Sequence, residues 1–284
     1  MVLEHLYPLK LIEKNLVFAF IIGMGYAIIG IGISVILFPE DPAIVSIAFI
    51  ALMFYPTINT LLKQEEEIEA TKDTFNLGEF FREHKHAFRV YILFFLGVLF
   101  AFSFFSIILP ALATNHIFKN QIDVMTGGNS GKAFDMGLFT DIFQNNLSVL
   151  LLCFIAALIF GDGSIFLIIW NASVWGTIFG NLAKTAAINV SKNPFIYFLI
   201  VIIIVFPHMV LEAFSYVCAA TAGGVISKGL IGESFFSDRF RFIIKNIILL
   251  IIFALLILVI AVTVETYVLM NVSVYRTIIQ QSFM

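Results

Sequence analysis

Charged residues are scarce in this sequence of 284 residues. Asp, Glu, Lys and Arg make up 12% of the chain and hydrophobic residues 61%, whereas a soluble domain carries about 25% charged residues. A soluble fold cannot hide so much apolar surface, so the soluble classes are excluded. The formal net charge of −3 provides no basic field that would attract a polyanion, and this argues against nucleic-acid binding.

Cysteine and histidine are also rare, with two cysteines and five histidines. Cys153 and Cys218 both lie inside apolar segments, where a thiol usually acts as a small hydrophobic side chain, so no disulfide is expected. The sequence lacks the Walker loop, the Gly-x-Ser-x-Gly nucleophile turn and the His-Glu-x-x-His zinc helix. It therefore predicts no cofactor and no assembled catalytic set.

Long apolar segments are what the sequence has in abundance. A segment of about twenty apolar residues can cross the roughly 30 Å hydrocarbon core of a bilayer. The pattern predicts an all-α fold, a polytopic transmembrane helical bundle that forms a single integral membrane domain over residues 1–284. The apolar segments are residues 16–38, 43–62, 90–109, 147–160, 165–188, 195–226 and 243–270.

The span count depends on residues 147–188, whose two apolar pieces are either two full spans or one single or re-entrant crossing. Lys and Arg favour the cytoplasmic side, and seven spans with a cytoplasmic N-terminus place more of them there than six spans do. We therefore predict about seven spans in the cell membrane. Residues 63–89 are then a charged cytoplasmic loop, and residues 110–141 are an extracytoplasmic loop.

Polar side chains inside the apolar segments are the candidate functional residues, because an unpartnered polar group is costly in hydrocarbon. A first cluster combines three amides, one carboxylate and one hydroxyl around the turn at residues 161–164. Its members are Asn145, Asn146, Asp162, Asn171 and Ser173. These residues either line a polar path or cap helix ends and hydrogen-bond neighbouring helices.

A second cluster consists of His208 and Glu212, whose four-residue spacing places both on one helix face after Pro207. The two groups could share a proton, bind a divalent metal, hold a polar headgroup, or form a buried pair that satisfies itself. A catalytic zinc needs three protein ligands, and no second histidine lies in a span, so a metal role stays open. Glu265, near the end of the last segment, is expected to reach the membrane interface.

With these residues, the sequence resembles the stage II sporulation protein M family, in particular its archaeal branch of membrane proteins. The matching stretches are residues 143–146 and 161–174, Gly180, Pro207-His208, Glu212 and Gly223-Gly224. Met209 and Asp162 depart from the family, which has glycine and a small residue at these positions. The resemblance implies a polytopic helical fold and little chemistry, because bacterial members work in a membrane complex whose partners degrade the cell wall.

Three functions remain. The leading hypothesis is a non-enzymatic scaffold of a membrane complex or a membrane-shaping protein, with membrane lipids, protein partners or further copies of the chain as its partners. The alternative is a transporter or lipid translocator whose polar path uses the two clusters. An intramembrane metal-dependent hydrolase ranks last, because His208 and Glu212 are an incomplete ligand set for zinc.

Overall fold

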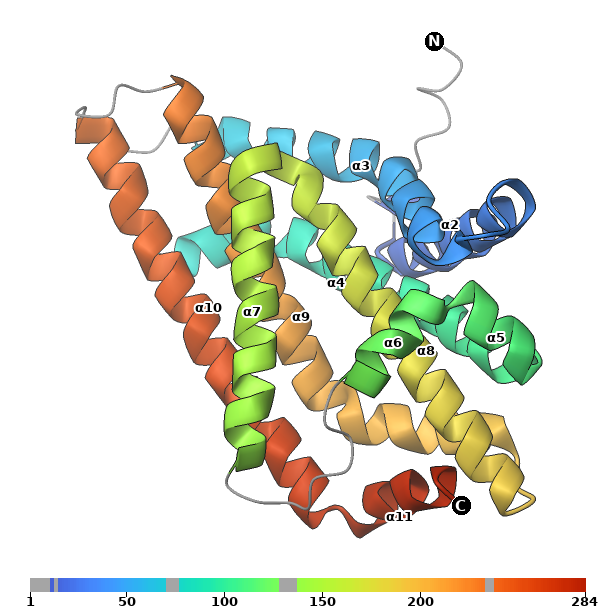
Figure 1. Ribbon diagram of the computed structural model, residues 1–284. Helices are drawn as coiled ribbons and strands as arrows, with labels where there is room; N and C mark the ends of the chain where they lie inside the picture. Colours follow the sequence, from blue (N-terminus) through green and yellow to red (C-terminus); the bar gives the residue numbers. More distant parts are fainter. Residues whose placement is uncertain (1–10, 13–14, 70–76, 128–136, 233–237) are drawn as a thin grey trace.

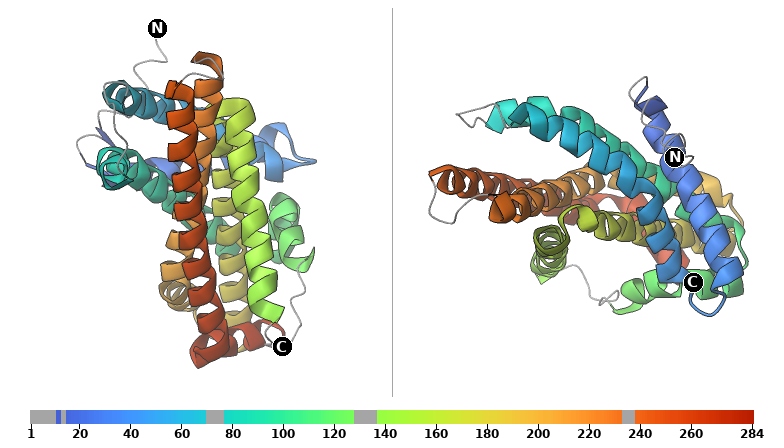
Figure 2. Two further views of the ribbon diagram at one scale, coloured as in Figure 1. Left: turned by 90° about the vertical axis from the view of Figure 1, so that its left-hand side faces the viewer. Right: turned by 90° about the horizontal axis from the view of Figure 1, so that it is seen from above.

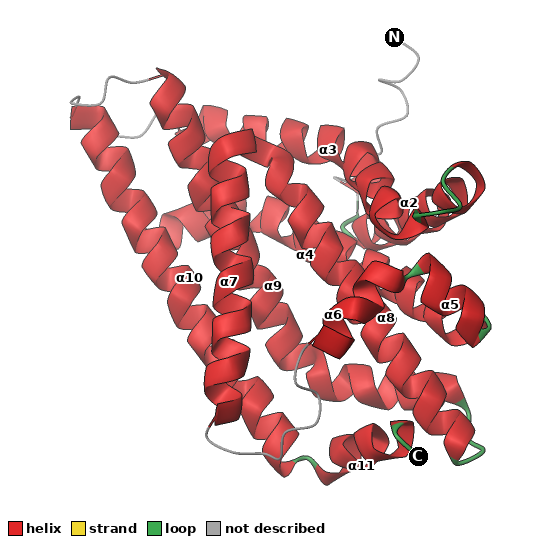
Figure 3. Cartoon of the chain, viewed as in Figure 1, coloured by secondary structure: helices red, strands yellow, loops and turns green. Residues whose placement is uncertain are grey.

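The computed structural model describes residues 11–12, 15–69, 77–127, 137–232 and 238–284 (Figure 1). Within these ranges every regular element is a helix and no strand is present (Figure 3). The elements are α2 (Val17–Leu37), α3 (Pro42–Glu69), α4 (Leu77–Ile108), α5 (Ala111–Ile117), α6 (Lys119–Gly127), α7 (Gly137–Phe160), the 3₁₀ turn η2 (Gly161–Ser164), α8 (Ile165–Asn189), α9 (Pro194–Gly232), α10 (Asp238–Asn271) and α11 (Ser273–Ser282).

Seven helices of the described chain contain a stretch that is long and apolar enough to cross a membrane. The predicted all-α polytopic bundle is therefore confirmed. Residues 147–188 belong to two helices of full span length, α7 and α8, joined at Gly161, whose φ of 60° favours glycine. The stretches are Val17–Leu37, Pro42–Thr60, Lys85–Ile108, Gly137–Phe160, Ile165–Asn189, Pro194–Ser227 and Ile243–Asn271.

Several helices extend beyond the apolar segments. α3 continues through Pro56 to Glu69 and α4 begins at Leu77, so much of the predicted cytoplasmic loop is helix end, while residues 70–76 lie outside the described part. This extension is physically reasonable because Glu, Lys and Gln are good helix formers outside the bilayer as well. The predicted extracytoplasmic loop holds α5 and α6, and α6 packs on α3 and α8 with Gln121 fully buried.

Two groups of helices differ in direction (Figures 1 and 2). α7, α9 and α10 run side by side, and α8 packs between α9 and α4. α2, α3 and α4 lie across α7 rather than alongside it. The first group, together with α8, surrounds the candidate site described below.

Glycine and serine bring α4 and α8 together. A Cβ on Gly180 would lie 2.6 Å from the carbonyl oxygen of Ser103, so only glycine fits there without a shift. Ser103 donates a hydrogen bond from Oγ to the carbonyl of Gly176 at 2.9 Å, and Ser106 donates to the carbonyl of Thr177 at 3.1 Å. Close backbone approach and hydroxyl hydrogen bonds are the usual means of joining helices in membranes.

The C-terminal helix α11 covers one end of the bundle, where it contacts α8 and α9. Tyr275 and Ile278 are its buried residues. Gln281 accepts hydrogen bonds from Asn189 at its backbone oxygen (2.8 Å) and from the Tyr197 hydroxyl at Oε1 (3.0 Å). Burial raises the pKa of the Tyr275 phenol, because the charged form loses its hydration.

Candidate functional site

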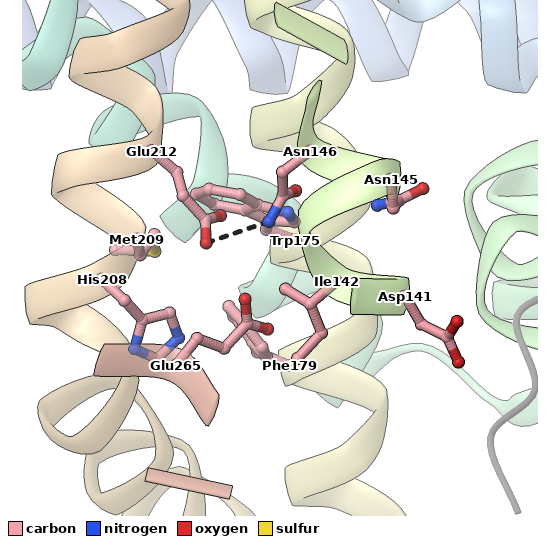
Figure 4. A pocket seen from close by; sticks show the side chains of 10 residues that line it. All are labelled: Asp141, Ile142, Asn145, Asn146, Trp175, Phe179, His208, Met209, Glu212 and Glu265. Carbon is pink, nitrogen blue, oxygen red and sulfur yellow. Dashed lines mark hydrogen bonds between the residues drawn. The ribbon is translucent and has the colours of Figure 1, made fainter. Parts of the chain in front are cut away.

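A cavity of about 360 Å³ lies between α7, α8, α9 and α10 (Figure 4). Each of the four helices contributes at least one side chain to its wall. The lining residues are Asp141, Ile142, Asn145 and Asn146 of α7, Trp175 and Phe179 of α8, His208, Met209 and Glu212 of α9, and Glu265 of α10.

α9 brings two of the predicted residues to the cavity. The helix is continuous through Pro207, so His208 and Glu212 stand one turn apart on the same wall. Only 5% of the His208 surface and 3% of the Glu212 surface are exposed. The His208 Nδ1 atom has no hydrogen-bond partner within the described residues.

Asn146 of α7 joins the α9 side chains by two hydrogen bonds. The Tyr216 hydroxyl donates to Asn146 Oδ1 at 2.9 Å, and Asn146 Nδ2 donates to Glu212 Oε1 at 3.2 Å. Gly223 permits this contact between helices, because it lies directly against the backbone of Phe154 on α7. The chain Tyr216–Asn146–Glu212 therefore fixes the orientation of the Asn146 amide and of the Glu212 carboxyl group.

Glu265 is the residue that sequence reasoning missed. Its carboxyl group lies next to that of Glu212 and interacts with it, and Figure 4 shows it between His208 and Ile142. Its Oε2 atom is buried and has no hydrogen-bond partner in the part of the chain that the structure describes. Glu265 was expected to reach the membrane interface, but its side chain instead lines the cavity with its Oε2 atom buried. The sequence did contain a signal for Glu265, because an ionisable residue inside a membrane span is usually functional.

Other residues of the first predicted cluster lie elsewhere. Asn171 Nδ2 donates to the carbonyl of Leu167 at 2.9 Å, and Ser173 Oγ donates to the carbonyl of Trp170 at 2.7 Å. Ser173 also accepts a hydrogen bond from Gln121 of α6 at 3.4 Å. Neither residue lines the cavity, and both serve local or interhelical bonding.

Two further predicted residues have distinct positions. Asn145 lines the cavity but is exposed, and in Figure 4 its side chain points away from the two glutamates, as does that of Asp141. Asp162 belongs to η2, and its side chain lies outside the described part. Asn145 and Asp141 therefore give the rim of the cavity a polar edge.

The chemistry available at the cavity is that of two carboxyl groups, one imidazole and one amide. No group of three or more His, Cys, Asp or Glu residues that could hold a metal ion is found in the described ranges. Carboxyl groups accept hydrogen bonds and attract positive charge. The arrangement can therefore hold a proton or a cationic group.

Comparison with known proteins gives one match. The family model described as stage II sporulation protein M matches residues 90–268, which include every residue that lines the cavity. No curated protein and no solved structure matches the chain.

Proposed function

We propose that this chain, which belongs to the stage II sporulation protein M family, is a non-enzymatic membrane protein that binds a small polar or cationic group in its cavity. In this proposal the protein passes the group through the membrane as a transporter or lipid translocator. The observation that carries the proposal is the meeting of the Glu212 and Glu265 carboxyl groups in a cavity between candidate spans.

Two adjacent carboxyl groups are a costly arrangement for a structural role. Burial penalises each charge, and like charges repel each other. Within the described residues, Glu212 accepts a hydrogen bond from Asn146 and is hydrogen-bonded to Glu265, whose Oε2 atom has no partner. A pair that existed for packing alone would be better satisfied, so a ligand that supplies positive charge or hydrogen-bond donors is the simplest reason for it.

Transport can be tested in proteoliposomes. Purified protein should accelerate the movement of amine-headgroup lipids or of small cations across the bilayer. Glu212→Gln should abolish this activity, whereas Glu40→Gln should not, because Glu40 is an exposed carboxylate in the α2–α3 turn, remote from the cavity. Liposomes that move neither lipids nor ions, or equal flux with Glu212→Gln, would contradict the proposal.

A scaffold of a membrane complex is the second candidate. It is favoured by Asn171 and Ser173, which are used for local and interhelical hydrogen bonds rather than for a polar path. A scaffold role also agrees with the family resemblance, which implies that members work in a membrane complex. Crosslinking in native membranes should then recover a specific partner. Recovery of none, with unchanged membrane morphology after gene deletion, would exclude the scaffold.

A further inference from the structure

We infer that the cavity takes an ammonium cation, carried by a small organic amine or by a lipid headgroup. This inference rests on the proposed function for the existence of a ligand, and it adds the chemical class. It combines three observations on the cavity: the sign of its charges, its aromatic wall, and its unsatisfied polar atoms.

The cavity carries acidic groups, and His208 is the one basic side chain among its lining residues. Glu212 and Glu265 meet inside it, Asp141 stands at the rim, and none of its lining residues is Lys or Arg. Lys184, on the same helix as Trp175, donates instead to the carbonyl oxygens of Ser106 and Leu109. A cationic ligand would therefore meet attraction from two carboxyl groups without competition from a lysine or arginine of the wall.

One wall of the cavity is aromatic. Trp175 and Phe179 are one turn apart on α8, and Figure 4 shows them behind the two glutamates. Aromatic faces attract ammonium groups through the ring quadrupole, and this attraction grows when the site excludes water. Carboxyl groups on one side and aromatic rings on the other are the combination that recognises alkylammonium groups.

A metal ion suits the same wall less well. Ca²⁺ and Mg²⁺ require about six oxygen ligands, and catalytic zinc requires three protein ligands. Residues of the described chain provide no group of three His, Cys, Asp or Glu side chains around one point. An ammonium group needs fewer carboxyl contacts, because the aromatic rings complete its surroundings.

Two polar atoms of the cavity wall lack hydrogen-bond partners within the described residues. In the described part of the chain, the Glu265 Oε2 atom is buried and has no hydrogen-bond partner. The same holds for the Nδ1 atom of His208, a residue that is 5% exposed. A primary ammonium would supply an N–H donor to Glu265 Oε2, whereas a quaternary ammonium would supply positive charge alone. The volume of about 360 Å³ is at the lower end of small-molecule sites, which favours a headgroup over a whole lipid.

The full-length protein in nanodiscs of phosphatidylglycerol, which lacks an amine, provides the test. We expect methylammonium and tetramethylammonium chloride to bind in calorimetry and to raise the melting temperature. Sodium chloride at equal ionic strength and uncharged tert-butanol should do neither. Glu212→Gln and Glu265→Gln should each weaken binding by about tenfold or more, because a charge-assisted contact is lost, while Glu40→Gln should bind normally.

Nanodiscs of phosphatidylserine, which carries an amine and the same net charge as phosphatidylglycerol, distinguish a lipid amine from a free amine as the ligand. Weaker binding of tetramethylammonium there than in phosphatidylglycerol would show that the lipid amine competes for the cavity, and equal binding would identify a free amine as the ligand. Both results support an ammonium site. Binding of neither ammonium salt, or unchanged binding by both glutamine variants, would overturn the inference. Ammonium binding without transport would refute the proposed function alone, and transport of an uncharged solute without ammonium binding would refute this inference alone.

Discussion

At the scale of single residues, Asn146 is the side chain on which the geometry of the cavity depends. It is 7% exposed and bonds both Tyr216 and Glu212. Asn146→Ala leaves a hydroxyl and a carboxyl oxygen without these partners, so we expect a loss of about 1–3 kcal/mol in the free energy of unfolding. Denaturation of the detergent-solubilised protein measures it.

Asn145→Ala is the matched control for this prediction. Asn145 is the preceding residue on the same helix, but it is exposed and points away from the glutamates. Its replacement should change stability by less than about 0.5 kcal/mol, as is usual for surface positions. Equal losses for the two variants would mean that the hydrogen bonds of Asn146 do not contribute to stability.

The sequence predicted part of this site. His208 and Glu212 were identifiable because helical spacing places residues four apart on one face. Glu265 was misjudged because its position in the last span does not reveal which neighbouring helix covers it. Asn171 and Ser173 could not be separated from Asn146, since an amide or hydroxyl in a span has the same sequence signal whether it bonds its own helix or a cavity.

At the scale of elements, the contact of α4 with α8 depends on Gly180. An added Cβ would meet the backbone of Ser103, which cannot move away without shifting the helix. Gly180→Ala should therefore destabilise the protein by about 1–3 kcal/mol through overpacking. Thermal melting of the purified variant measures this loss.

The same glycine-to-alanine substitution at Gly32 of α2 should have the opposite effect on stability. A Cβ there meets no atom within 4 Å. Gly32→Ala should leave stability unchanged or raise it by up to about 1 kcal/mol, because alanine favours the helix. A stabilising Gly180→Ala would show that α4 and α8 are less closely packed than the structure indicates.

The packing of α11 predicts a dependence on pH. The folded state raises the pKa of Tyr275, so its contribution to stability is complete below the unfolded value of about 10 and is lost as pH rises above it. The melting temperature should therefore fall above about pH 10. Tyr275→Phe should make this fall smaller, and an identical fall in the variant would show that Tyr275 does not take part.

Helix ends were the least predictable elements. The apolar segments stop at charged residues, but α3 continues to Glu69 and α4 starts at Leu77. Hydropathy reports where a helix leaves the hydrocarbon and not where its hydrogen bonds end. For residues 147–188, in contrast, the sequence left two crossings or one, and the distribution of Lys and Arg favoured two; the structure has two separate helices, α7 and α8.

At the scale of the whole molecule, the sidedness of the chain is the prediction to test. Seven spans with a cytoplasmic N-terminus place Glu40 and Lys192 outside and Lys85 inside. A membrane-impermeant maleimide added to intact cells should label Glu40→Cys and Lys192→Cys, and should label Lys85→Cys only after permeabilisation. The native Cys153 and Cys218 are buried, so they should add little background.

The labelling pattern also distinguishes two alternative topologies, an inverted chain and a chain with six spans. The reverse pattern would mean that the whole chain is inverted in the membrane. Labelling of Glu40→Cys but not of Lys192→Cys in intact cells would restore the six-span arrangement, in which residues 147–188 cross only once. Either result would also change the side of the membrane that the Asp141 rim of the cavity faces.

The different directions of the helices have a consequence for the surrounding lipid. Because α2, α3 and α4 lie across α7, no single membrane normal can be parallel to both groups. Spanning helices tilt by about 20° on average, and here at least one of the two groups must be inclined to the membrane normal. An inclined helix matches a thinner hydrocarbon layer, and the first shell of lipids around this protein should therefore vary in thickness from one side to the other.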